Sequence, residues 1–386
     1  MTKTAICGIK FRLERFFHHI AYGGQEKGTP FFLSLLLSPL YLLSLFYGLA
    51  VNIRVSLFNK GLKESRSLPC KVISVGNITV GGTGKTPVVE YIARQLTERG
   101  LKVAILSRGY KGTAHNPVNV VSDGQTIFME PHQAGDEPYM LAKRLRDVPV
   151  IVGADRYVTG SYGVEHFHVD VLVLDDGYQH IKVKRDVNIL LVDGERGFGN
   201  GHLFPRGPLR EPLSNMERAD FVLVTKCKKP AQGVGASGFM PDFSKIKAKP
   251  LTFCSGYEPL NLQSFWTGNK ESVSVITGKK VVTLSGIANP SSFTALIKSL
   301  GGNVLHEEAF PDHHAYSPKD LHGVMKKAEN LGADMIVTTE KDAVKIEEID
   351  ERVRIPFYYL QIGLDLFGDD ERFVENILSR CGIRET

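Results

Sequence analysis

The residues with the clearest chemical potential are a run of glycines that ends in Lys85 and Thr86. Glycines let backbone N–H groups close around phosphate oxygens, and a helix that starts behind them adds partial positive charge. A lysine in this position reaches the β- and γ-phosphates of a nucleotide, and a threonine hydroxyl can bind Mg²⁺. The predicted phosphate-binding residues are Thr79, Val80, Gly81, Gly82, Thr83, Gly84, Lys85 and Thr86.

The sequence on either side has the elements that such a loop requires. Val72, Ile73 and Val75 are apolar and β-branched, which predicts a buried strand. Residues 88–99 place apolar side chains at helical spacing before Gly100. The strict pattern has a glycine five residues before Gly84, where Thr79 stands, so a plain glycine-rich turn is the alternative.

Asp175 and Asp176 follow a second apolar run, residues 171–174. Ligands of a parallel sheet bind at the carboxyl ends of its strands, and a carboxylate there holds Mg²⁺ in phosphate-loop enzymes. The pair is therefore predicted to lie at the metal. An acidic turn before Gly177 is the alternative.

Three further segments carry polar side chains whose role the local pattern leaves open. Asp136 stands at a predicted helix start, where a capping role would explain it. In a loop rich in proline and glycine, Arg206 or Arg210 could meet phosphate and Glu211 could meet metal, or all three could face only solvent. His313 lies in the run 310–316, which lacks the spacing of a zinc site and allows acid–base chemistry or no special role.

The elements that must position these residues indicate an α/β protein. Residues 67–229 alternate predicted strands and helices, which favours a parallel sheet covered by helices, of the P-loop NTPase type. Residues 230–250 are rich in Gly, Pro, Ser and Lys without periodicity, and we expect a linker there. Residues 251–386 alternate again and predict a second, smaller α/β domain.

Residues 1–66 differ from the rest in charge. They hold nine Lys or Arg and three Glu, a net charge of +6, whereas the whole chain carries +5. Between the charges, residues 28–53 contain no charged residue at all. An apolar helix flanked by basic residues is typical of a membrane-associated segment. A buried helical hairpin is the alternative.

Several motifs occur together in one order: VGNITVGGTGKTP, LSRGYKG, GDEPYMLA, VLDDGYQH, GPLREP, FPDHHAYS and VTTEKDAVK. In this combination the chain resembles the tetraacyldisaccharide 4′-kinase family, the lipid A 4′-kinases of Gram-negative bacteria. The resemblance extends over nearly the whole sequence. The loop of that family has the glycines and the threonine found here, so Thr79 is no departure from it.

The resemblance implies a reaction and a place. ATP, with Mg²⁺, donates its γ-phosphate to the 4′-hydroxyl of a tetraacyl glucosamine disaccharide 1-phosphate and yields lipid IVA. The enzyme works at the cytoplasmic face of the bacterial inner membrane, where the N-terminal segment contacts membrane and lipid. Nucleic acid is not an expected partner.

The resemblance also implies roles for single residues. Asp136 is similar to the proposed catalytic base of the family, paired with His313, although the adjoining His314 leaves the choice of histidine open. The other catalytic positions are Lys85 and Arg156, the metal-associated carboxylates are Asp175, Asp176 and Glu211, and the nucleotide-side positions are Gln179 and Arg210. Because Asp136 and His313 lie on either side of the predicted linker, their meeting would place the site between two domains.

Two other functions fit part of the sequence. A nucleotide-dependent switch or targeting factor would use the phosphate-binding loop without a lipid acceptor. An ATPase that binds nucleic acid would use the basic N-terminal segment, but the uncharged residues 28–53 argue against that reading.

Overall fold

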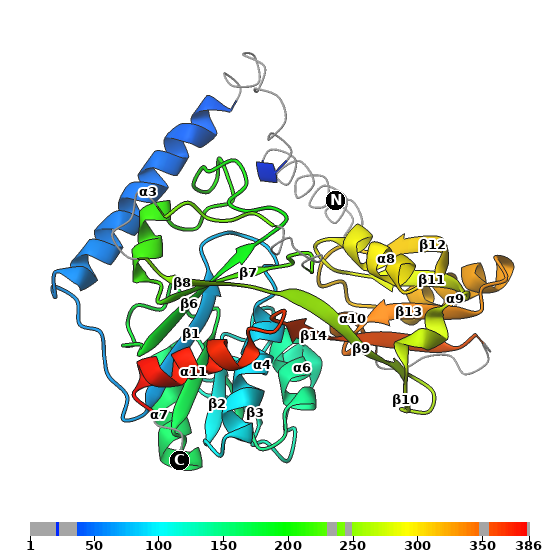
Figure 1. The fold of residues 1–386 in the computed structure, drawn as a ribbon, viewed down its shortest axis with the longest axis horizontal. Helices are drawn as coiled ribbons and strands as arrows, with labels where there is room; N and C mark the ends of the chain where they lie inside the picture. The colour runs from blue at the N-terminus through cyan, green and yellow to red at the C-terminus, as the bar shows by residue number, and fades with distance from the viewer. Residues whose placement is uncertain (1–20, 23–36, 230–237, 244–248, 347–354, 384–386) are drawn as a thin grey trace. The chain divides into compact units, whose positions relative to one another are not determined.

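The computed structural model describes residues 21–22, 37–229, 238–243, 249–346 and 355–383 (Figure 1). The chain divides into two compact units. The first unit combines residues 1–106, 155–256 and 365–386, and the second combines residues 107–154 and 257–364. Each unit contains strands and helices, which confirms the predicted α/β class.

The first unit is built on parallel strands in the order β2-β5-β1-β6-β7-β8. The strands are β1 (Lys71–Asn77), β2 (Val103–Ser107), β5 (Val171–Asp175), β6 (Val187–Asp193), β7 (Phe221–Thr225) and β8 (Leu251–Cys254). The helices are α3 (Ser38–Asn59), α4 (Lys85–Glu98), α7 (Arg156–Phe167), the 3₁₀ helix η1 (Leu213–Arg218) and α11 (Asp370–Cys381). This is the parallel sheet with helices that the sequence predicts for a P-loop protein.

Burial explains why the central strands read as continuous apolar runs. Every residue of β5 and β7 is buried, as expected for parallel strands with helices on both faces. Helix α11 comes from the far end of the chain and belongs to the same core. Its Phe373 is fully buried and packs edge-to-face on Phe253 of β8, with ring centroids 5.0 Å apart.

The second unit contains a six-stranded sheet in the order β10-β9-β14-β13-β11-β12. Its strands are β9 (Gly256–Ser264), β10 (Lys270–Glu271), β11 (Lys280–Ser285), β12 (Asn303–Ala309), β13 (Met335–Thr339) and β14 (Phe357–Asp365). The antiparallel pair β3 (Asn119–Ser122) and β4 (Val150–Val152) also belongs to this unit. Its helices are α5 (Pro131–Ala134), α6 (Asp136–Arg144), η2 (Val273–Ile276), α8 (Pro290–Ser299), α9 (Pro318–Asn330) and α10 (Glu340–Ala343).

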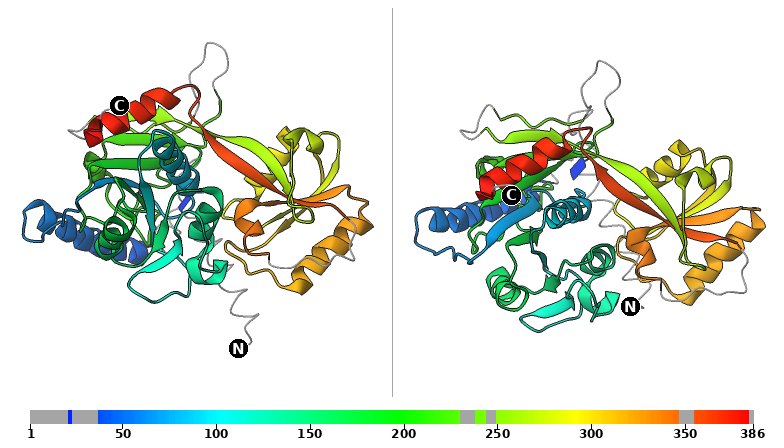
Figure 2. Two further views of the ribbon diagram at one scale, coloured as in Figure 1. Left: turned by 90° about the horizontal axis from the view of Figure 1, so that it is seen from below. Right: turned by 60° about the horizontal axis from the view of Figure 1, so that its bottom comes forward.

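Helices α8 and α9 lie on opposite faces of this sheet (Figure 2). Successive side chains of β11 point to opposite faces of the sheet and so enter different apolar cores. Val281 packs with Ile297 of α8, whereas the next residue, Val282, packs with Leu321 of α9. The two faces therefore hold separate apolar clusters.

The division into units differs from the linear division predicted from the sequence. By their contacts, residues 107–154 group with residues 257–364 in the second unit, although the strands β3 and β4 extend the β2 edge of the eight-stranded sheet. Residues 365–386 group with the first unit. Residues 230–237 and 244–248 of the predicted linker lie outside the described residues, and β8 follows directly. Alternation along the chain cannot reveal this grouping, because it shows that strands and helices follow one another and not which distant segments they contact.

Helix α3 is long and apolar enough to cross a membrane by length and composition, with a mean hydropathy of 1.5. Only 17% of its most apolar 18-residue stretch is buried. Its apolar side chains at positions 42, 45, 46 and 49 share one face and are exposed: Leu42 57%, Leu45 51%, Phe46 69% and Leu49 58%. Tyr47 instead donates to the backbone oxygen of Arg210 at 2.9 Å. Residues 1–20 and 23–36 of the predicted N-terminal segment lie outside the described residues, and the membrane contact stays a prediction.

The close approach at Gly76 of β1 gives a test of this packing. A Cβ there would lie 2.7 Å from the backbone nitrogen of Tyr178, so Gly76→Ala should lower the free energy of unfolding by about 1–3 kcal/mol. The matched control is Gly323→Ala in α9, where no atom lies within 4 Å of the new Cβ. We expect that change to stabilise by about 0.5–1 kcal/mol. Urea unfolding of the detergent-purified variants measures both, and a Gly76→Ala protein as stable as the parent would contradict the packing described.

Candidate active site

The predicted phosphate-binding loop connects β1 to α4. Gly84 caps α4 with φ of 76°, and Gly81 has φ of 111°, conformations that favour glycine. A Cβ at Gly82 would meet no atom within 4 Å, so the space beside the loop is open. Lys85 begins the helix, and Thr86 is buried one residue later. The loop therefore presents the N-terminus of a 14-residue helix to a ligand, as anion binding requires.

Residues that follow other strands hold this loop in place. Thr225, at the end of β7, donates its hydroxyl to the backbone oxygen of Thr83 at 2.8 Å. Lys226 donates to the backbone oxygen of Gly82, also at 2.8 Å. The segment 208–210 hydrogen-bonds the backbone on the strand side of the loop. Sequence reasoning missed Thr225 and Lys226, although a Thr-Lys pair directly after an apolar strand was a signal for them.

Asp176 lies between two cations. Its carboxylate is 3.5 Å from the Nζ of Lys85 and 3.0 Å from a guanidinium nitrogen of Arg210. Burial alone would raise the pKa of Asp176, but the charges of Lys85 and Arg210 outweigh it and lower the pKa to about 2. The carboxylate is therefore ionised at neutral pH, and the structure brings together three of the predicted site residues.

Asp175 is the last residue of β5 and pairs in register with Val75 of β1. Its position puts a buried carboxylate at the same sheet edge as Thr86, the first buried residue after Lys85. Arg156, the first residue of α7, is 1% exposed and donates to the backbone oxygen of Asp175 at 3.5 Å. Arg156 thus contacts the end of the strand that carries the aspartate.

Glu211 and Gln179 have partners within the protein. Glu211 is buried, forms an ion pair with Arg218 and accepts a hydrogen bond from Asn215 at 2.7 Å. Gln179 donates to the backbone oxygen of Asn77, just before the phosphate-binding loop, at 2.9 Å. In the part of the chain that the structure describes, no three His, Cys, Asp or Glu side chains converge as a ready-made metal site.

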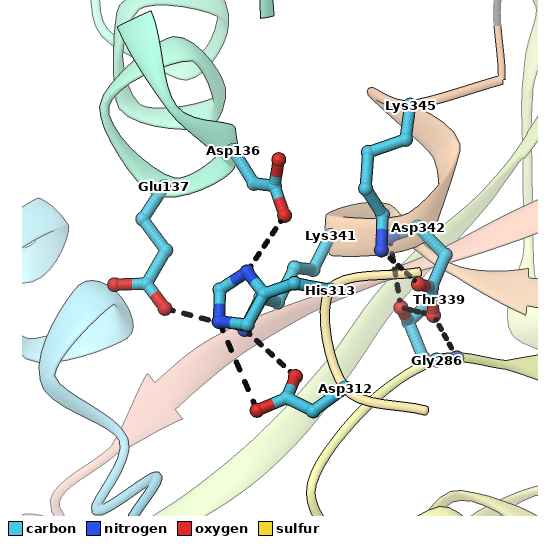
Figure 3. Close-up of polar contacts among 9 residues, drawn as sticks. All are labelled: Asp136, Glu137, Gly286, Asp312, His313, Thr339, Lys341, Asp342 and Lys345. Carbon is cyan, nitrogen blue, oxygen red and sulfur yellow. Dashed lines mark hydrogen bonds and ion pairs between the residues drawn. The ribbon is translucent and has the colours of Figure 1, made fainter. Parts of the chain in front are cut away.

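The second unit contains the predicted pair of Asp136 and His313 (Figure 3). The Nδ1 atom of His313 lies 2.9 Å from the Oδ2 atom of Asp136, and both side chains are largely buried. The adjoining His314 turns elsewhere and contacts Asp320 at 3.1 Å. Both members of the pair belong to one unit, because residues 107–154 group with residues 257–364.

Asp136 does not act as a helix cap. It is the first residue of α6, whose N-cap is Gly135, and no side chain caps that end. Burial alone would raise the pKa of Asp136, but the hydrogen bond from His313 and the charges of Lys345 and Lys341 outweigh it, so the pKa lies below its ordinary value. Asp136 is an ionised carboxylate that is hydrogen-bonded to an imidazole, which is an arrangement suited to proton transfer.

Comparison with known proteins supports one family. The sequence model of tetraacyldisaccharide-1-P 4′-kinase matches residues 34–382. The tetraacyldisaccharide 4′-kinase of Syntrophus aciditrophicus is 40% identical over 348 residues, 89% of this chain and 91% of that protein. The enzyme of that name from Desulfatibacillum aliphaticivorans is also 40% identical, over 90% of this chain and 93% of its own.

A solved structure agrees with the sequence comparisons. The fold is similar to a crystal structure of LpxK from Aquifex aeolicus in complex with ATP, with a TM-score of 0.70 and 31% identity over 90% of this chain and 99% of that one. A nucleotide-dependent switch is not favoured, because these relatives are kinases. Together with the phosphate-binding loop and the Asp136–His313 pair, the matches over nearly the full length show that this chain belongs to the tetraacyldisaccharide-1-P 4′-kinase family.

Proposed function

We propose that the protein transfers the γ-phosphate of ATP to the 4′-hydroxyl of a tetraacyl glucosamine disaccharide 1-phosphate and yields lipid IVA. The observation that carries the proposal is the hydrogen bond between Asp136 and His313 in a chain that also holds a phosphate-binding loop. A switch needs only the loop, whereas a kinase must also accept a proton from its acceptor hydroxyl. The relatives named for this reaction, and the one described with ATP, support both substrates.

The first unit would bind the nucleotide. Backbone N–H groups of the loop and the start of α4 face the phosphates, and Lys85 follows the charge of the transferring group. Arg210, which pairs with Asp176 at 3.0 Å, adds a second cation at the same place. Gln179 and Arg156 support the loop and the end of β5 through backbone oxygens.

The residues at this sheet edge fit Mg²⁺. Thr86 and Asp175 offer hard oxygen donors, and Asp176, the residue after Asp175, is ionised. Mg²⁺ keeps several waters and takes phosphate oxygens as ligands, so it does not require three protein side chains. When bound, the ion neutralises charge on the transferring phosphoryl group. Glu211 contacts Arg218 and Asn215 through its Oε2 atom, and its part in binding the ion stays a prediction.

The second unit would accept the proton that the acceptor hydroxyl loses. At neutral pH Asp136 is ionised, because its pKa lies below the ordinary value, and its carboxylate can accept the proton of the acceptor hydroxyl. His313 holds one carboxylate oxygen by a 2.9 Å hydrogen bond and thereby orients the other. His313 thus acts as the orienting partner of the base.

The exposed apolar face of α3 suits an enzyme whose acceptor is a lipid. Four neighbouring side chains at positions 42, 45, 46 and 49 are more than half exposed, and residues 1–66 carry a net charge of +6. Apolar burial combined with attraction to anionic headgroups is how interfacial helices bind. We infer that this face contacts the cytoplasmic side of the inner membrane.

Labelled ATP tests the reaction. With the acylated disaccharide 1-phosphate in detergent, we expect label on the lipid. ATP hydrolysis at the same rate with and without the lipid, and with no label on it, would contradict the proposal. Lys85→Ala should lower transfer by at least about 10²–10³-fold, because it removes a cation that stabilises the transferring charge. Lys71→Ala, which breaks only an exposed pair with Asp186, is the control. A Lys85→Ala enzyme within a few-fold of the parent would exclude the loop as the phosphate site.

A double-mutant cycle tests the pair. Asp136→Asn and His313→Gln should each lower kcat by about 10²–10⁴-fold with little change in the KM for ATP. Because the two side chains act as a unit, the double variant should be hardly worse than either single variant. His314→Gln, in the same loop but paired with Asp320, is the matched control and should retain activity. If the fold-loss of kcat in the double variant equals the product of the two single losses, the two residues act independently.

Two substitutions on α3 test the membrane contact. Phe46→Glu with Leu49→Glu should move the protein from the membrane to the soluble fraction, because both side chains are exposed and their loss leaves the core intact. Leu331→Glu, at an exposed apolar residue of the second unit, controls for added charge. Fractionation of cells that express each variant measures the effect. A double variant that stays in the membrane would show that another segment is the anchor.

A further inference from the structure

We propose that Lys341 is a positioning residue that fixes the ring proton of His313 on Nδ1, where it faces Asp136. Lys341 lies in the motif VTTEKDAVK, to which the functions above assign no role. The inference rests on the proposed kinase function, since it concerns the base pair of that reaction. Figure 3 shows the lysine beside the imidazole.

The ammonium group of Lys341 has three acceptors around it. Its Nζ atom lies 3.2 Å from the Nε2 atom of His313, 3.3 Å from the Oδ1 atom of Asp312 and 3.4 Å from the Oε1 atom of Glu137. Burial alone would lower the pKa of Lys341, but Glu137 and Asp312 outweigh it and the pKa is raised. Lys341 is therefore a cation with three N–H donors and one acceptor for each.

This contact decides which nitrogen of the imidazole carries the proton. An ammonium only donates, so the Nε2 atom of His313 must accept, and the ring proton is on Nδ1. That proton is then donated to Asp136 over 2.9 Å. The opposite tautomer would turn an N–H toward the ammonium and a lone pair toward the carboxylate. Asp312 does not stabilise this opposite tautomer by accepting from an Nε2–H group, because its Oδ2 atom is 3.8 Å from Nε2, beyond hydrogen-bond range.

Helix α10 fixes the position of Lys341 relative to both Asp136 and His313. Glu340, its first residue, forms an ion pair with Arg144, the last residue of the helix that Asp136 begins. Asp342 is fully buried and accepts from the backbone nitrogen of Gly286 at 2.9 Å. The backbone oxygen of Gly286 in turn accepts from the backbone nitrogen of His313, whose φ is +62°. One turn of helix thus fixes the helix of the base and the strained loop of the histidine.

The charges around the imidazole predict what happens without the lysine. Asp136, Glu137 and Asp312 contribute three carboxylates, the ring of Tyr110 lies edge-on with centroids 5.8 Å apart, and Lys345 is paired with the buried Asp342. In the described part of the chain, Lys341 is the cation that contacts the ring. Its removal would favour a doubly protonated imidazole, and a positive partner makes Asp136 a poorer proton acceptor.

The pH profile of kcat tests this role in the full-length enzyme. Lys341→Met should lower kcat at neutral pH by about 10–100-fold, the usual scale for loss of an orienting partner, and should move the acid limb to higher pH. The KM for ATP should stay unchanged. Lys341→Arg, which keeps a donor-only cation, should keep the acid limb near that of the parent. Lys327→Met, which removes only an exposed lysine paired with Glu308, is the matched control.

Nitrogen NMR of the histidine ring gives a readout that does not depend on activity. In ¹⁵N-histidine-labelled parent protein, with His313→Gln for assignment, we expect His313 to show a protonated Nδ1 and a bare Nε2 at neutral pH. A protonated Nε2 in the parent, or a Lys341→Met enzyme with an unmoved acid limb, would overturn the proposal. If the parent transfers no phosphate to the lipid, the proposed function fails while the NMR result still decides the tautomer.

Discussion

A carboxylate kept ionised by neighbouring cations is the interaction on which both parts of the chemistry depend. In each unit burial works against the charge and would raise the pKa of the aspartate. In the first unit Lys85 and Arg210 reverse this effect at Asp176, and in the second unit His313 and two lysines reverse it at Asp136. Lys85, Arg210 and His313, which lower these pKa values, are also residues to which the proposed reaction assigns roles in phosphate binding and proton transfer. Charge balance in the folded protein and chemistry therefore use one set of side chains.

Both sites are positioned by groups that lie behind them rather than by the reacting residues themselves. Thr225 and Lys226 hold backbone oxygens of the phosphate-binding loop, and Asp342 holds the backbone of Gly286 beneath His313. These contacts are made to backbone atoms, so they hold the main chain of each loop directly. Such preorganisation matters in phosphoryl transfer, where the protein contributes mainly by position and electrostatics.

The exposed face of α3 raises a different physical problem. Large apolar side chains in water cost free energy, and on a soluble protein a contiguous patch of them marks a contact surface. One side of the same helix is nevertheless tied to the first unit, since Tyr47 and Arg54 donate to the backbone oxygens of Arg210 and Gln179. With the proposed membrane contact, a helix bound in this way would connect a lipid surface to the loops around the nucleotide site.

The sequence alone determined what is local. Glycines, a lysine and a threonine between a strand and a helix specify the phosphate-binding loop, because the backbone conformation there depends on neighbouring residues. The same holds for Asp175 and Asp176 at a strand end and for most strands and helices, whose apolar periodicity the fold reproduces.

Only the tertiary structure decided what depends on distant residues. Asp136 and His313 are 177 positions apart, and no spacing shows that they share a hydrogen bond, so from sequence their pairing came only from resemblance. The ion pair of Glu211 with Arg218, the preference of Asp136 for His313 over His314, and the contact of Lys341 with the imidazole were equally hidden. Which side chains meet is fixed by the path of the folded chain and by the direction in which each side chain turns, and neither leaves a pattern in the local sequence.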